Sequence, residues 1–216
     1  MSFTLINCLQ AQTGWYFQHP KSEGNILQSC YFKNNYKGLA VGEKVTILKN
    51  TNGGFDWGKI SCLITTDLYG VSYISADNAI GKSELILKAN YVGNTWLVQS
   101  VSVYLNLNAV NFCNSNLGII VGDIGKILRT ADGGDTFTTQ TCGTTSILNA
   151  VYIIDENNVT VVGNYGTILW NADGGITWDY QASPVNQQFN SVAFSNPNIG
   201  LMTILPSTGN YLSTPL

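Results

Sequence analysis

The sequence predicts an all-β chain, folded as a five-bladed β-propeller with four antiparallel strands in each blade. Three observations predict this fold. A pattern of short apolar strands recurs along the chain, and its Ile-Leu pair begins at residues 47, 86, 127 and 168, a period of about 40 residues. Glycine-rich turns follow these strands at matching positions. The composition is rich in Asn, Gly, Thr and Tyr and poor in helix formers.

The clearest repeat covers residues 107–137. Its first strand contains Val110 and Phe112, which alternate with polar neighbours as in a half-buried strand. Residues 119–121 are continuously apolar and β-branched, which predicts a second strand covered on both faces. Residues 122–125, Gly-Asp-Ile-Gly, form a hairpin connection to a third strand, because glycine readily adopts positive φ.

The repeat ends in an octet, Thr-Ala-Asp-Gly-Gly-Asp-Thr-Phe, that fits the Asp-box pattern with Phe137 in place of Trp. A short carboxylate such as Asp132 can accept backbone N–H bonds inside its own turn. The terminal aromatic offers a large apolar face to the neighbouring strand. This turn chemistry accounts for the aspartate, so we predict a structural role for it rather than a role as a ligand or an acid.

Four repeats carry this turn or a remnant of it, at residues 27–57, 68–96, 107–137 and 148–178. The second is the most altered. The residues expected to build the turns are Asn52, Gly54, Trp57, Trp96, Asp132, Gly134, Phe137, Asp173, Gly175 and Trp178.

A fifth repeat begins at Phe189 and carries three strand patterns, the last at residues 211–212, with no Asp-box. Residues 14–20 match residues 176–184 as an aromatic-rich segment that leads through a polar loop into a repeat. We therefore predict that this N-terminal strand closes the last blade, which leaves no open sheet edge. The alternative is a chain that continues past Leu216 and forms a larger ring.

The rest of the chain's organisation follows from this assignment. Residues 13–216 are expected to form a single propeller domain, and residues 1–12 either a remnant of a signal peptide or a short arm. A signal peptide would direct the protein to the cell surface or the extracellular space. Cofactors are not expected, and we predict a monomer.

The cysteines are expected to be free. Removing residues 1–12 leaves an even number, Cys30, Cys62, Cys113 and Cys142. The two members of each neighbouring pair fall on inner and outer strands about 14 Å apart. A disulfide requires Cα atoms within about 7 Å, so we predict mostly free, buried thiols.

Ligands of propellers usually bind where the turns between second and third strands meet the links between blades. In this sequence that face would carry Glu43, Lys82, Asp123, Asn164 and Tyr165. A polar ring of this kind around a central channel is the expected ligand site. The alternative interpretation is a solvated rim of turn-forming residues.

Several classes of function are excluded or unsupported by composition. The net charge is −3 with only 11% charged residues, so no basic patch can hold nucleic acid. No apolar run approaches the ~18 residues of a membrane span. A single histidine, His19, excludes a His-rich metal cluster. A single arginine, Arg129, cannot build the three-arginine carboxylate clamp of sialidases.

Residues 14–57, with 121–137 and 162–178, resemble the BNR/Asp-box propellers related to photosystem II stability and assembly factors, most closely the secreted bacterial versions. The resemblance covers nearly the whole chain. It implies a propeller fold and a role in adhesion, glycan binding or scaffolding. The basic, arginine-rich patch associated with the photosynthetic members has no counterpart here, so their role does not carry over.

The sequence therefore favours a non-catalytic propeller that binds a glycan or a protein on the face named above. An assembly or chaperone-like factor is the first alternative. A glycoside hydrolase is the second, although no pair among the thirteen acids has a distinctive sequence context.

Overall fold

The structure is a computed structural model, and it describes residues 25–62, 66–73, 79–82, 86–89, 96–99 and 105–204. All regular secondary structure within these ranges is β-strand, which confirms the all-β class. The predicted strands at residues 14–20 and 211–212, and the boundary at residue 12, lie outside the described residues.

The strands form five antiparallel sheets, which we number as blades 1 to 5 along the chain. Blade 1 contains β1 (Leu27–Phe32), β2 (Gly38–Gly42), β3 (Thr46–Asn50) and β4 (Trp57–Lys59). Blade 2 contains β5 (Gly70–Tyr73), β6 (Ala79–Lys82), β7 (Ile86–Ala89) and β8 (Trp96–Gln99). Blade 3 contains β9 (Leu107–Phe112), β10 (Gly118–Gly122), β11 (Ile127–Thr130) and β12 (Thr138–Gln140). Blade 4 contains β13 (Leu148–Ile153), β14 (Val159–Gly163), β15 (Ile168–Asn171) and β16 (Asp179–Gln181), and blade 5 contains β17 (Phe189–Asn196) and β18 (Ile199–Ile204).

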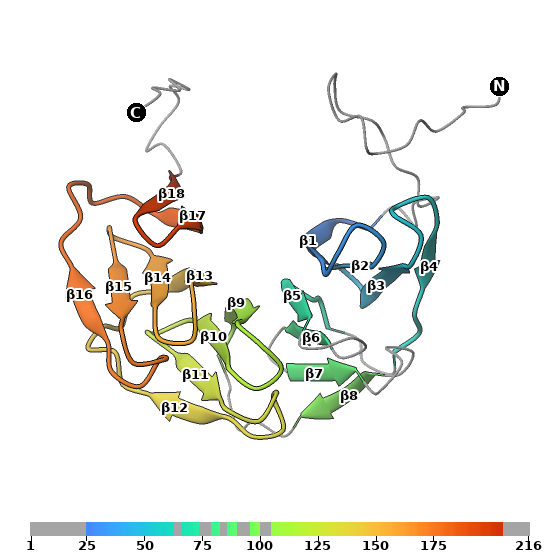
Figure 1. Ribbon diagram of the computed structural model, residues 1–216, viewed down its shortest axis with the longest axis horizontal. Coiled ribbons are helices and arrows are strands. Elements are labelled where there is room, and N and C mark those ends of the chain that lie inside the picture. The colour runs from blue at the N-terminus through green and yellow to red at the C-terminus, as the bar shows by residue number, and fades with distance from the viewer. Residues whose placement is uncertain are drawn as a thin grey trace, which may run out of the picture.

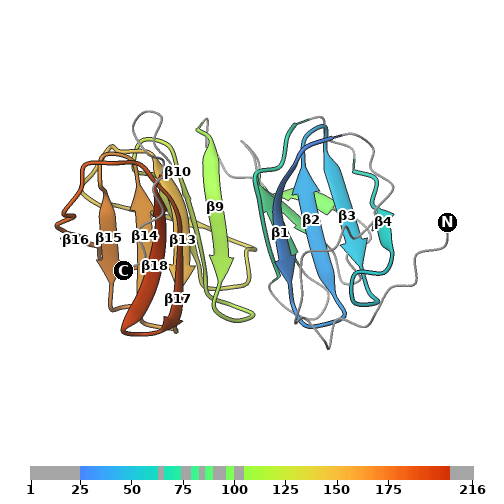
Figure 2. The ribbon, with the colours of Figure 1, turned by 90° about the horizontal axis from the view of Figure 1, so that it is seen from above.

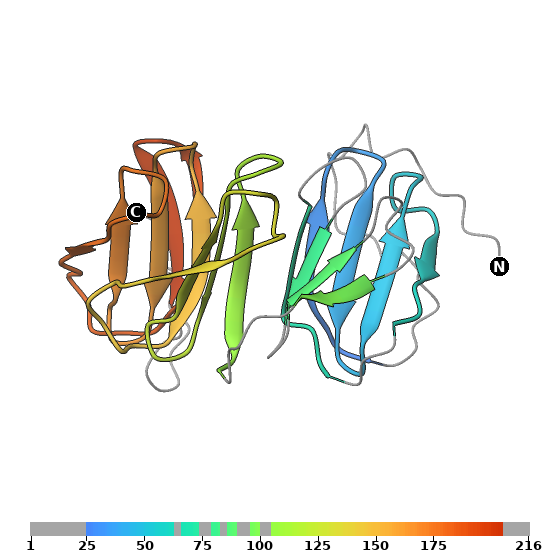
Figure 3. The ribbon, with the colours of Figure 1, turned by 90° about the horizontal axis from the view of Figure 1, so that it is seen from below.

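The blades follow one another around an arc, with the first strand of each blade on the inside and the fourth on the outside (Figure 1). The strands stand along the axis of the arc, so the loops gather on two opposite faces (Figures 2 and 3). Four blades have the predicted four antiparallel strands. The described residues do not close the arc into a ring, because β1 and β17 face each other across an opening in Figure 1.

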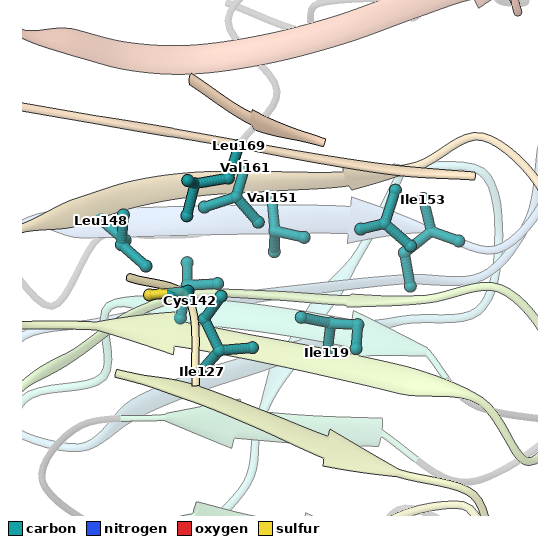
Figure 4. Packing of buried hydrophobic residues seen from close by; sticks show 10 residues of the cluster. Ile119, Ile127, Cys142, Leu148, Val151, Ile153, Val161 and Leu169 are labelled. Atoms are coloured by element: carbon teal, nitrogen blue, oxygen red, sulfur yellow. The ribbon is translucent and has the colours of Figure 1, made fainter. Parts of the chain in front are cut away.

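The hydrophobic core lies between neighbouring blades. Figure 4 shows the cluster between blades 3 and 4, where Ile119 and Ile127 pack against Leu148 and Val161. The second strands β2, β10 and β14 are buried at every residue, as expected for a strand covered on both faces. Blade-to-blade packing therefore supplies the burial that a single twisted sheet of this length could not provide.

The first blade departs from this pattern because the described residues place no blade before it. Leu27 of β1 is 45% exposed, whereas Leu148, at the same strand position in blade 4, is fully buried. Cys30 is exposed for the same reason, so its predicted burial is wrong. Cys142 is buried, Cys62 and Cys113 are half-buried, and all four thiols are free as predicted.

Candidate functional site

The turns between second and third strands lie beside the links between blades, and backbone hydrogen bonds join them. In blade 3 the amide of Gly125 donates to the carbonyl of Ser146 over 2.8 Å. In blade 4 the amide of Asn164 donates to Ile147 over 2.9 Å, and Gly166 donates to Gln187 over 2.7 Å. We call this surface the turn–link face.

The turns on this face have an unusual backbone. Both central residues have positive φ, 54° and 63° for Ile124 and Gly125, and 57° and 68° for Tyr165 and Gly166. This is the pattern of a type I′ turn, which normally places Asn, Asp or Gly at both positions. A β-branched or bulky residue at positive φ is a genuine outlier. The side chains of Ile124 and Tyr165 at these turn corners are both exposed.

The glycines in these turns allow the links to lie directly against them. A Cβ added to Gly125 would lie 1.9 Å from the carbonyl oxygen of Thr144, and one added to Gly166 would lie 2.2 Å from that of Val185. Both positions therefore require glycine for the close approach as well as for φ. The turn corners and the links form one continuous surface.

That surface carries a row of exposed apolar side chains across blades 3 and 4, which we call the apolar row. Its members are Ile124 (58% exposed), Ile147 (39%), Tyr165 (73%) and Val185 (38%). Ile147 connects the two turns, because its predecessor Ser146 bonds the first turn and Ile147 itself bonds the second. Exposed apolar side chains on neighbouring turns and links are typical of an interaction site when they form a patch.

The structure gives two of the candidate rim residues partners inside the protein. One carboxylate oxygen of Asp123 accepts a hydrogen bond from the amide of Asn106 at 2.9 Å, and the other accepts one from Asn108 at 3.0 Å. Oδ1 of Asn164 accepts a bond from Nδ2 of Asn149 at 2.8 Å. These side chains fasten each turn to the first strand of its own blade.

The other three candidates lie on separate parts of the arc. Glu43 occupies the same turn position in blade 1 as Asp123 does in blade 3, and its backbone carbonyl accepts a bond from Thr46. Lys82 is the last residue of β6 in blade 2. Tyr165 stands on the turn–link face of blade 4. The five candidates are therefore spread over four blades and do not form one cluster.

Sequence analysis missed two residues that join the blades at this face. Asn108 donates to the carbonyl of Leu148 at 3.1 Å, and Asn149 donates to that of Phe189 at 2.8 Å. Each asparagine is the second residue of an inner strand, and each reaches the first residue of the next inner strand. The tetrapeptide Leu-Asn-Ala-Val, which occurs at both 107–110 and 148–151, was the signal that could have identified them.

The aspartate turns lie on the opposite face. Oδ1 of Asp132 accepts bonds from the amides of Asp135 and Thr136, and Oδ2 accepts one from the Thr136 hydroxyl. Burial alone would raise the pKa of Asp132, but the bonds from Thr136 and Thr130 outweigh it and hold the pKa well below its usual range. The carboxylate is thus committed to its own turn.

The same turn occurs in blades 1 and 4. Bonds from the hydroxyl and the amide of Thr177 hold the pKa of Asp173 well below its usual range. In blade 1 an amide replaces the carboxylate, and Oδ1 of Asn52 accepts the backbone N–H of Asp56 at 3.0 Å. The terminal aromatics Phe137 and Trp178 pack against the core clusters beside them.

Long side chains on the third strands join each aspartate turn to the preceding blade. Nζ of Lys88 in blade 2 bonds Oδ1 of Asp135 in blade 3 at 2.5 Å. Nε of Arg129 in blade 3 donates to the carbonyl of Gly174 in blade 4 at 2.7 Å. The face that carries the aspartate turns therefore serves blade-to-blade contacts.

Among the residues that the structure describes, no group of three or more His, Cys, Asp and Glu side chains could hold a metal ion. The same part of the chain contains no helix that could span a bilayer.

Three solved structures share this architecture. The chain matches YCF48 from Cyanidioschyzon merolae with a TM-score of 0.67 and 15% identity, over 86% of this chain and 69% of the other. It matches an ancestral GH74 enzyme with a TM-score of 0.71 and 16% identity, over 86% of this chain and 28% of the enzyme. It matches the WD40 β-propeller domain of Doa1 with a TM-score of 0.69 and 11% identity, over 84% and 63%.

At these identities the likeness shows the fold alone, an antiparallel β-propeller architecture. No family model matches the sequence, and no curated protein matches it.

Proposed function

We propose that this chain is a non-catalytic propeller that binds a protein ligand on its turn–link face. The observation that carries the proposal is the apolar row, four exposed apolar side chains on turns and links that backbone hydrogen bonds hold in place. Three of the four are aliphatic and only Tyr165 has a ring. Sugars bind by stacking on aromatic rings, so this composition favours protein side chains over a glycan.

The backbone of the turns supports the same proposal. Holding Ile124 and Tyr165 at positive φ costs about 1 kcal/mol or more for each residue. Asparagine or glycine would make the same turn without that cost. An apolar side chain retained there is presented in a fixed direction, which lowers the entropy lost when a ligand binds.

The three shifted carboxylates are not suited to act as the general acid of a hydrolase. A glycosidase needs a general acid whose pKa is raised. In Asp132, Asp155 and Asp173 the pKa is instead lowered, in each case by hydrogen bonds within a turn. These three groups remain ionised and occupied by their own turns.

A selection experiment tests the proposal. A random peptide library and a glycan array are screened in parallel against the immobilised protein, and every ligand is then tested on Tyr165→Ala. Tyr180→Ala is the matched control, since Tyr180 is an exposed tyrosine on the outermost strand β16. We expect selected peptides that lose at least tenfold in affinity on Tyr165→Ala and keep it on Tyr180→Ala. Glycans that bind through Tyr165, or peptides that ignore it, contradict the proposal.

We also propose that the complete chain is a closed, five-bladed monomer at the cell surface or outside the cell. The spacing of residues 14–20 before β1 resembles the spacing of each fourth strand before the next blade. Closure would cover the exposed side of β1, so Cys30 should be alkylated much more slowly in the native monomer than in urea. Rapid alkylation in a species that native mass spectrometry identifies as monomeric would contradict closure.

A further inference from the structure

The inner rim of the turn–link face presents hydrogen-bond acceptors from two neighbouring blades. Nδ2 of Asn108 donates to Asp123 and to the carbonyl of Leu148, and Nδ2 of Asn149 donates to Asn164 and to the carbonyl of Phe189. An amide nitrogen has two protons, so both nitrogens are fully used.

These bonds also fix which way each amide faces. The carbonyls of Leu148 and Phe189 can only accept, so the atom that meets each of them must be the nitrogen. Oδ1 of Asn108 and Oδ1 of Asn149 accept no hydrogen bond from the described residues. Each of the two asparagines is half-buried and offers a ligand an acceptor and no donor.

A negative charge stands beside these acceptors. The carboxylate of Asp123 receives one neutral amide at each oxygen, from Asn106 and Asn108. No ion pair joins it to a described cation, including Lys126 of the same turn. Two amide donors use only part of the acceptor capacity of a carboxylate, which has about four lone-pair sites.

We propose that this row of acceptors, Asn108, Asp123 and Asn149, binds the guanidinium group of an arginine side chain in the protein ligand. The three side chains of this row have no free donor for an anion or a neutral acceptor. Guanidinium spreads five N–H donors over a plane and never loses its charge, so it can satisfy acceptors from two blades together.

The apolar row lies next to these acceptors and matches the rest of an arginine side chain. Asn164, which accepts the bond from Asn149, is hydrogen-bonded through its backbone to Ile147 and precedes Tyr165. The methylene stem of arginine packs on apolar surface while its head reaches a polar site. The inference rests on the proposed function and specifies one residue of the ligand.

The test uses Nα-acetyl-L-arginine amide as a probe and Nα-acetyl-L-citrulline amide as its neutral analogue. The readout is the ¹⁵N–¹H signals of the Asn108 and Asn149 side-chain amides during titration. We expect the arginine probe to shift both signals saturably and to bind at least tenfold more tightly than the citrulline probe. Equal binding of the two probes, or no shift of these signals, overturns the inference.

Three variants complete the test. Asp123→Asn should weaken the arginine probe about tenfold because it removes the charge. Asp179→Asn removes the same charge from the outermost strand β16 and should leave binding unchanged. Lys126→Gln removes a cation from the turn of Asp123 and should strengthen binding about twofold, an effect that a purely structural role for this turn would not produce. An Asp123→Asn protein that folds and binds the arginine probe as tightly as the wild type overturns the inference.

The two proposals fail in different ways. Peptides that bind through Tyr165 while the arginine probe does not bind would refute the guanidinium site and leave the protein-binding function intact. Binding of the arginine probe without any Tyr165-dependent peptide would refute the wider function and leave the guanidinium site intact.

Discussion

Two glycines in blade 3 and the link after it allow the contact between turn and link to be measured. Gly125 and Gly143 both have positive φ, 63° and 73°. A Cβ on Gly125 would lie 1.9 Å from the carbonyl oxygen of Thr144, whereas one on Gly143 would meet nothing within 4 Å. Gly125→Ala and Gly143→Ala therefore impose similar backbone strain and differ in the clash.

The expected costs follow from these distances. Alanine in the left-handed region costs about 1–2 kcal/mol, and its stiffer unfolded chain returns about 0.4–1 kcal/mol, so Gly143→Ala should cost about 1 kcal/mol. In Gly125→Ala the link must retreat by about 1 Å, which breaks the bond from Gly125 to Ser146. A buried, unpaired backbone group costs a further 1–3 kcal/mol or so, for a total of about 3 kcal/mol.

Urea unfolding followed by tryptophan fluorescence measures both free energies. Gly166→Ala, whose Cβ would lie 2.2 Å from the carbonyl oxygen of Val185, repeats the test in blade 4 and should resemble Gly125→Ala. Costs for Gly125→Ala and Gly143→Ala that agree within about 0.5 kcal/mol would refute the close packing of turn against link, since the clash would then contribute nothing.

Three further predictions concern the contacts within and between blades. The folded-state pKa of Asp132 is lowered, so the stability that its carboxylate contributes is complete above the ordinary pKa near 4 and is lost as the pH falls. Asp132→Asn should therefore flatten the decline in unfolding free energy between about pH 5 and 2. An unchanged slope would contradict this. Tyr152→Phe removes the 3.0 Å hydrogen bond from the hydroxyl to the carbonyl of Phe194 but keeps the ring contact, so it should lower the free energy of urea unfolding by about 1 kcal/mol. No change would show that this bond does not contribute to stability. Lys88→Gln removes the ion pair with Asp135, which is largely exposed, so it should lower the free energy of unfolding by less than about 0.5 kcal/mol and remove the salt dependence of that pair. A larger loss that does not depend on salt would show a structural role beyond the ion pair.

Much of the fold could be predicted because burial in this protein follows a sequence period. Residues 119–121 and 161–162 are continuously apolar, and each run lies in a second strand buried on both faces. The turn residues are equally local, since Asp132 and Asp173 find their partners within four positions. Local chemistry of this kind can be identified in a sequence without knowledge of the fold.

The site could be predicted only in part, because its contacts join residues between 15 and 40 positions apart. Asp123 was identified as a turn residue, but its two amide partners come from the inner strand and the link before it. Asn108 and Asn149 bond main-chain carbonyls of the following blade, and no side-chain pattern marks a carbonyl. Cys30 occupies the strand position that buried valines occupy in blades 3 and 4, so its position in the repeat predicts burial. Its actual exposure depends on what packs before blade 1.

The asparagine contacts have a consequence for how such a chain can change its length. Asn108 and Asn149 each reach forward to a carbonyl, a group that every residue possesses. A newly duplicated unit would find its attachment point already present in its neighbour, whatever side chains that neighbour carried. These asparagine contacts would therefore need no matching side-chain substitution in the neighbour when a whole unit is gained or lost.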